Sequence, residues 1–177
     1  MHIGGGPLNR TLPLLNATFT FIHPNYEARK PMSASFCQQT QLFSFETEPH
    51  SFTLITKDVA AWLDRIAADT GTLTLFVKHT SASLTVQENA DPTVRLDLQD
   101  ALSALAPRDR AYRHHMEGPD DMPGHIKSML TDTSLTIPVV DGLMDLGTWQ
   151  GLFLIEHRDQ PHTRRIRALF QGVAVRQ

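Results

Sequence analysis

Histidines and acids are concentrated in residues 112–125, a segment that we expect to form a loop leading into a helix. Three of its residues are histidines, His114, His115 and His125, and three are acids. Neutral imidazole binds divalent metals, and three imidazoles that leave a fourth position open are typical of catalytic zinc sites. The spacing matches no short metal signature such as HExxH, so the segment favours a metal site without defining its ligands.

A second polar group begins at His79, which ends a strand-like segment and is followed by the hydroxyls of Thr80, Ser81 and Ser83. Such hydroxyls can orient an imidazole or hold a polar ligand. Residues 87–91 then gather polar side chains directly before a predicted helix. The free amides and the dipole of that helix N-terminus would favour an anion.

A third group begins with residues 146–151, which lead into a strand that ends at Glu156. By strand period, Gln150 and Glu156 share a face with two leucines. An acid on an apolar face is costly unless it is paired. Possible partners, which could also hold a phosphate, are Arg164, Arg165 and Arg167.

Each group also has a structural interpretation. A histidine at a strand end is more often a hydrogen-bonded structural residue than a ligand. An ordinary ion pair explains Glu156 equally well. Trp149 is more typical of a core than of a stacking platform, and the arginines are compatible with one solvated strand face.

Six strands are expected to position these groups, at residues 39–46, 51–55, 72–79, 134–140, 151–157 and 165–173. Between them we expect about three helices. Strands outnumber helices and do not alternate strictly with them, which predicts a single α+β domain with mainly antiparallel sheets.

The three helices carry different signals. The first should begin with Thr56 as its cap, end near Gly71, and bury Val59, Trp62, Leu63 and Ile66. The second should begin with the Asp91 cap and Pro92, end at Pro107, and present Val94, Leu98, Ala101, Leu102 and Leu105. The third should follow Asp121 and turn Met122, Ile126, Met129 and Leu130 inward.

Composition excludes several classes of protein. The 177 residues are 41% apolar and 20% charged with a net charge of -3, which is ordinary for one globular domain. A slightly negative net charge does not favour binding to nucleic acids or to anionic membranes. No apolar run approaches the roughly 20 residues that a membrane-spanning helix needs. Cys37 is the single cysteine, which excludes an intrachain disulfide and favours a reducing cytoplasm. No glycine-rich phosphate loop of P-loop or Rossmann spacing is present.

Residues 1–36 differ from the rest of the chain in their glycines and prolines and in their lack of a helical or strand period. We expect a poorly structured N-terminal extension, or sequence upstream of a true start at Met32, ahead of a domain spanning 37–177. A faint likeness to a signal peptide at residues 12–22 is interrupted by polar side chains.

Several of these segments together resemble the YjbQ-like family, which is catalogued as secondary thiamine-phosphate synthase. The resemblance covers about residues 38–174, and its motifs stand in the right order with similar gaps. They lie at residues 79–85, 88–89, 91–92, 112, 114, 117–118, 120–123, 125–127, 147–151 and 156–158.

The resemblance implies a β-sandwich-like α+β fold, a homotrimer, and a polar pocket that holds a metal generally taken as zinc. Carried over by position, the metal candidates are His79, His114 and His125. The pocket candidates are Asn89, Asp91, Gln150, Glu156 and Arg165. His115 stands where relatives often carry an acid, so it could compete for the metal.

The leading hypothesis is a metal-assisted enzyme acting on a phosphorylated small molecule, with thiamine-phosphate synthesis as the candidate reaction. Glu156 or Asp91 would accept a proton or orient a ligand, and Arg165 would stabilise negative charge. Ligand contacts are assigned to Ser81, Ser83, Asn89 and Gln150. The first alternative is a non-catalytic module that binds a phosphorylated metabolite. The second has the histidines satisfying buried hydrogen bonds in a trimer core.

Overall fold

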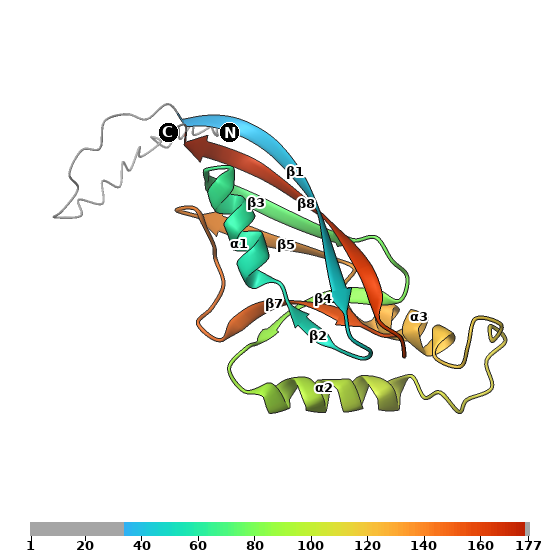
Figure 1. Cartoon of the computed structure of the whole chain (residues 1–177). Helices are drawn as coiled ribbons and strands as arrows, with labels where there is room; N and C mark the ends of the chain where they lie inside the picture. Colours follow the sequence, from blue (N-terminus) through green and yellow to red (C-terminus); the bar gives the residue numbers. More distant parts are fainter. Residues whose placement is uncertain (1–33, 176–177) are drawn as a thin grey trace, which may run out of the picture. The chain divides into compact units, whose positions relative to one another are not determined.

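The computed structural model describes residues 34–175, which form eight strands and three helices (Figure 1). In chain order these are β1 Ala34–Thr47, β2 Phe52–Leu54, α1 Thr56–Arg65, β3 Ala68–Val77, β4 Ala82–Glu88, α2 Pro92–Leu105, α3 Asp121–Leu130, β5 Ser134–Val140, β6 Leu143–Met144, β7 Gln150–Glu156 and β8 His162–Val175. The expectation about residues 1–33 lies outside the described residues. β1 begins at Ala34, ahead of the domain boundary expected at Cys37.

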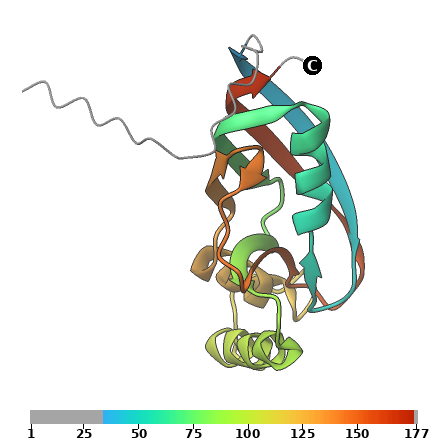
Figure 2. The same cartoon turned by 90° about the vertical axis from the view of Figure 1, so that its left-hand side faces the viewer.

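Two sheets carry the fold. The strand order is β1-β8-β3-β5-β6 in the larger sheet and β2-β7-β4 in the smaller one, and every pairing is antiparallel. Both views show α1 along the five-stranded sheet, and α2 on the side of the three-stranded sheet that faces away from the larger sheet (Figure 1, Figure 2). The predicted single-domain α+β architecture is therefore confirmed for the described part.

The core lies where the larger sheet meets α1 and the smaller sheet. Alternate residues of β3 and β8 are buried, including Leu73, Leu75, Ile166 and Phe170. The predicted face of α1 is confirmed, because Val59, Trp62 and Leu63 are buried and Ile66 packs against the same cluster. The period of two in the strands and of 3.6 in the helix decides which side chains leave water.

The sequence interpretation missed strand β4, which we expected as a polar stretch. It pairs with β7 over its whole length, from Ala82 opposite Glu156 to Glu88 opposite Gln150. Ala82 and Leu84 are buried in the core, while serine and threonine alternate with them. Small and hydroxyl side chains gave this strand a weak hydrophobic alternation.

Helix α1 begins at Thr56 as predicted, but the predicted cap and the predicted end near Gly71 are wrong. Ile55 occupies the cap position without a side-chain cap, and the Thr56 hydroxyl instead accepts a hydrogen bond from the Leu152 amide at 2.8 Å. The helix ends at Arg65, and the left-handed residue that follows is Ala67, with φ 51°. Gly71 lies inside β3, where it faces Gly172 of β8.

The start of α2 is as predicted, since the Asp91 carboxylate accepts a hydrogen bond from the Thr93 amide at 2.8 Å and Pro92 is the first helical residue. Its expected apolar face is only partly covered: no α2 residue is fully buried, and Leu105 is 66% exposed.

The expected inward face of α3 is wrong, because Met129 is 79% and Leu130 53% exposed. The helix instead buries small and polar residues, namely Asp121, Pro123, Gly124, Lys127 and Ser128. Small side chains allow the close approach in which the Ser128 hydroxyl donates to the Ala82 carbonyl at 3.3 Å. No helix of residues 34–175 combines the length and apolar character needed to cross a membrane.

Candidate metal centre

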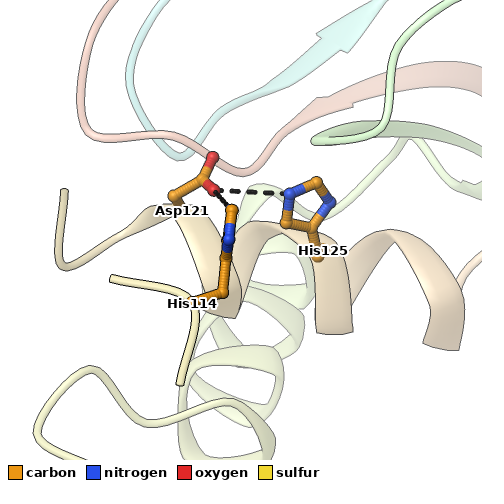
Figure 3. A group of neighbouring side chains, drawn as sticks. All are labelled: His114, Asp121 and His125. Carbon is orange, nitrogen blue, oxygen red and sulfur yellow. Dashed lines mark hydrogen bonds and ion pairs between the residues drawn. The ribbon is translucent and has the colours of Figure 1, made fainter. Parts of the chain in front are cut away.

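Two histidines and an aspartate meet at the N-terminus of α3 (Figure 3). Asp121 is the first residue of the helix and His125 lies one turn later, so both point to the same side. His114 comes from the preceding loop. Asp121 Oδ2 lies 2.7 Å from His114 Nε2 and 3.3 Å from His125 Nε2. One ligand atom from each residue lies within 4.8 Å of the others, which makes this a group that could hold a metal ion.

The donor set fits a divalent metal. Two imidazoles and one carboxylate are protein ligands typical of catalytic zinc, which keeps a fourth position open. Ligand atoms bound tetrahedrally at about 2.0–2.2 Å would stand about 3.4 Å apart. The separation of 3.3 Å between Asp121 Oδ2 and His125 Nε2 is close to this value, whereas the 2.7 Å between Asp121 Oδ2 and His114 Nε2 is a hydrogen-bond distance. The His114 side chain is 46% exposed, so the group opens to solvent on that side.

Arg158 holds the carboxylates at this helix end. Its Nη1 donates to Asp121 Oδ1, its Nε donates to Asp120 Oδ2 at 2.8 Å, and its Nη2 donates to the Glu117 carbonyl at 3.0 Å. Although burial opposes the shift, the hydrogen bond to Asp120 and the surrounding carboxylates raise the pKa of Arg158. Asp121 is thereby oriented with its other oxygen toward both imidazoles.

His79 does not belong to this group. Its Nε2 accepts a hydrogen bond from the Arg165 amide at 2.8 Å, which is the structural role that strand-end histidines often have. Burial, followed by the charge of Arg164, lowers the pKa of His79. Of the three predicted metal ligands, the fold brings His114 and His125 together and adds Asp121. The spacing of four between Asp121 and His125 on a predicted helix was the signal that could have identified this third member.

Glu156 lies at the centre of a separate buried network and is only 1% exposed. It accepts hydrogen bonds from Thr47 Oγ1 at 2.7 Å, from Arg164 Nε at 2.6 Å, from Arg164 Nη2, and from the Arg158 amide at 2.9 Å. Burial opposes ionisation, yet the hydrogen bond from Arg164 and the other donors lower the pKa of Glu156. Its partner is Arg164 rather than Arg165, because alternate residues of β8 face opposite ways and Arg165 is exposed.

The two serines after His79 also take part in buried hydrogen bonds. Ser81 Oγ accepts from Arg164 Nη2 at 3.2 Å, and Ser83 Oγ lies 2.9 Å from His157 Nε2. Burial lowers the pKa of His157 to about 3, so this imidazole is neutral near pH 7. Arg158 and His157 belong to a motif that carries the family resemblance, but neither was assigned a role in the site, because their roles depend on contacts with distant segments.

The remaining predicted pocket residues lie at the other end of the small sheet. Asn89 Nδ2 donates to the Gln150 carbonyl at 3.3 Å, and Gln150 Oε1 accepts from the Gly147 amide at 2.8 Å. Asp91 caps α2 beside them. In the β4–β7 register, Gln150 and Glu156 stand at opposite ends, six residues or about 20 Å apart. The predicted pocket residues therefore form two separate groups within one chain.

Comparisons with known sequences identify relatives along most of the chain. The family model described as UPF0047 protein YjbQ-like matches residues 41–173. A UPF0047 protein of Synechocystis sp. is 47% identical over 135 residues, which cover 76% of this chain and 92% of the relative. UPF0047 protein YjbQ of Salmonella typhimurium is 47% identical over 126 residues, covering 71% of this chain and 91% of the relative.

Solved structures share the fold. The crystal structure of an uncharacterized conserved protein of the YjbQ/UPF0047 family from Clostridium acetobutylicum matches with a TM-score of 0.68 at 33% identity, covering 73% of this chain and 98% of that one. A conserved hypothetical protein from Thermus thermophilus matches with a TM-score of 0.60 at 39% identity, covering 76% of this chain and 99% of that one.

Proposed function

This chain belongs to the UPF0047 YjbQ-like family, and we propose that it is a metal-assisted enzyme acting on a phosphorylated small molecule. The metal, zinc foremost, would be held by His114, Asp121 and His125. The observation that carries the proposal is that one ligand atom from each of these three side chains lies within 4.8 Å of the others. The second oxygen of the Asp121 carboxylate accepts a hydrogen bond from Arg158. Polar groups arranged around an open position are typical of functional sites.

Arg158, His114 and Glu156 would each have a different role in this site. Arg158 would fix the Asp121 carboxylate, and the exposed side of His114 would leave room for a ligand oxygen. Glu156 would serve as an orienting residue, because its hydrogen bonds hold Arg164 and the Arg158 amide in place. A bound divalent ion would supply Lewis-acid polarisation of a phosphate oxygen, or a water of lowered pKa.

Thiamine-phosphate synthesis remains the named candidate reaction through the family resemblance. In that reaction a ring nitrogen of a thiazole phosphate forms a bond to the methylene carbon of an aminopyrimidine methyl diphosphate. The carbon–oxygen bond to diphosphate breaks, and diphosphate leaves with the electron pair. A metal beside the diphosphate would stabilise the charge that develops on this leaving group.

The alternative is a module that binds a phosphorylated metabolite without turnover. It is favoured by the occupation of both predicted proton acceptors: Glu156 accepts hydrogen bonds at both carboxylate oxygens, and Asp91 caps α2. Thermal stabilisation by phosphorylated compounds, with no product formed by the metal-loaded protein, would favour this alternative.

A homotrimer, in a reducing cytoplasm, is also part of the proposal. It is supported by exposed apolar side chains on the outer face of the larger sheet. Leu42 of β1 and Phe76 of β3 are both paired with Arg167 of the strand between them, β8. Assembly would cover this face and could bring the two groups of pocket residues together between copies. Light scattering after size exclusion should give a trimer, and Phe76→Asp should dissociate it. A monomeric wild type would contradict this part of the proposal.

Metal content, measured by plasma mass spectrometry on untagged protein, tests the metal centre itself. We expect near-stoichiometric zinc in the wild type and its loss in His114→Ala, Asp121→Asn and His125→Ala, each shown by circular dichroism to be folded. His115→Ala is the matched control and should retain the metal. Wild-type protein that stays metal-free after reloading would overturn the metal-assisted mechanism.

A further inference from the structure

A cavity of about 340 Å³ adjoins the exposed side of His114. Its wall is formed by the loop between α2 and α3 and by the beginning of α3, and it includes Arg108, Arg110, Tyr112, His115 and Met122. Small-molecule sites commonly have volumes of roughly 300–1,000 Å³, so the cavity has the size of a small ligand. His114 lies on this wall and also in the candidate metal centre, so the two sites share a boundary.

Both formally charged side chains on the cavity wall are positive. Two arginines and two histidines line it, and no acidic side chain does. Arg108 pairs with Asp159, which lies off the wall. Arg110 forms no ion pair with a carboxylate of residues 34–175. An exposed guanidinium that has no carboxylate partner is available to a ligand anion.

Arg110 is positioned by an aromatic ring. Its guanidinium carbon lies 5.8 Å from the centroid of Tyr112, within the range of a cation–π contact. The Tyr112 hydroxyl donates to the Pro107 carbonyl at 2.9 Å, which anchors the ring. The ring therefore restricts where the cationic group can lie, and less conformational freedom is lost when an anion binds.

Two further features of the wall are fixed by the fold. The His115 ring is held at the wall by the contact of its Nδ1 with the Arg113 carbonyl at 2.9 Å. Met122 belongs to the first turn of α3, where the helix dipole also favours negative charge.

We propose that this cavity is the anion subsite of the metal centre and binds the phosphate or diphosphate group of a small ligand. Arg110 is its main charge partner, with Arg108 and His115 beside it, and His114 marks the side on which a phosphate oxygen would reach the metal. This assignment replaces Arg165 and the α2 N-terminus, neither of which lies on the cavity wall. The inference rests on the proposed function for the chemistry, but the subsite is testable without metal.

Titration calorimetry of the full chain with diphosphate, inorganic phosphate and malonate tests the subsite, in metal-free protein and in protein loaded with zinc. Arg110→Ala should weaken diphosphate binding at least about tenfold in both states, as expected for the loss of a charge-assisted contact. Arg65→Ala, an equal charge change on α1, is the control and should alter the affinity less than about twofold. Diphosphate should bind more tightly than malonate if the subsite is built for phosphate.

The two proposals fail in different ways. If His125→Ala and zinc have no effect on diphosphate binding while Arg110→Ala still weakens it, the anion subsite stands and the metal-assisted mechanism fails. If Arg110→Ala binds diphosphate as the wild type does, the subsite assignment is overturned whatever the metal content. Absence of diphosphate binding by the wild type in both states, or a preference for malonate, would also overturn it.

Discussion

Arg158 and Asp121 form an ion pair in which each carboxylate oxygen has a separate role. Oδ1 is held by the Arg158 guanidinium, and Oδ2 lies 2.7 Å from His114 Nε2 and 3.3 Å from His125 Nε2. Asp121 is nearly buried, with a side chain that is 3% exposed, so its orientation depends on Arg158. The arrangement resembles metal sites in which an outer residue fixes a ligand.

Replacing Arg158 should weaken metal binding without removing a ligand. We expect Arg158→Lys to lower zinc affinity about 10–100-fold, because lysine keeps the charge but cannot contact Asp120, Asp121 and the Glu117 carbonyl together. Competition with a chromophoric chelator measures the change, and Arg65→Lys serves as the control. Unchanged affinity in Arg158→Lys would show that Asp121 is oriented by other contacts.

The pair of Glu156 and Arg164 should matter mainly for stability. Glu156→Gln leaves the Arg164 guanidinium, which is 4% exposed as a residue, without its charged partner. Breaking a buried pair from one side typically costs about 3–5 kcal/mol, so urea unfolding should show a large loss. The double variant Glu156→Gln with Arg164→Met should recover part of it. A folded Glu156→Gln of wild-type stability that had lost activity would instead point to a catalytic carboxylate.

Acid should destabilise the protein partly through His157. Burial lowers its pKa from 6.5 to about 3, so between these values the unfolded chain takes up a proton that the folded chain does not. Stability should therefore fall as pH decreases below 6.5, by up to about 1.4 kcal/mol per pH unit. His157→Gln should flatten the pH dependence of unfolding between pH 6.5 and 5, where most carboxylates stay ionised. His115→Gln is the exposed control; equal slopes in both variants would contradict the assignment.

The contact between Gly71 and Gly172 should tolerate no side chain. A Cβ at Gly71 would stand 2.4 Å from the Gln171 carbonyl oxygen and 2.7 Å from Gly172 Cα, and both obstacles are backbone. Gly71→Ala should therefore destabilise the protein by about 2 kcal/mol or more. Gly147→Ala, whose Cβ would meet nothing closer than 3.4 Å, is the matched control in the same thermal unfolding experiment. Equal midpoints for the two variants would contradict this packing.

Local signals were sufficient for much of the fold. The alternation of Leu73 and Leu75, the spacing of Val59, Trp62 and Leu63, and the Asp91 cap each depend on neighbours close in sequence, and each was predicted correctly. Helix α3 was predicted at the right place, but its predicted inward face was wrong, because close packing on β4 favours small residues such as Gly124 and Ser128 over methionine.

The sequence by itself determined the antiparallel α+β class, most strand and helix positions, and the segment that supplies His114 and His125. The tertiary structure alone decided that Asp121 joins them, that His79 bonds to the Arg165 amide, and that Asn89 and Glu156 lie at opposite ends of one sheet. The physical reason is that periodicity and capping act over a few residues, whereas a site depends on where separate elements meet. That meeting is set by strand register, helix packing and buried ion pairs such as that of Arg158 with Asp121.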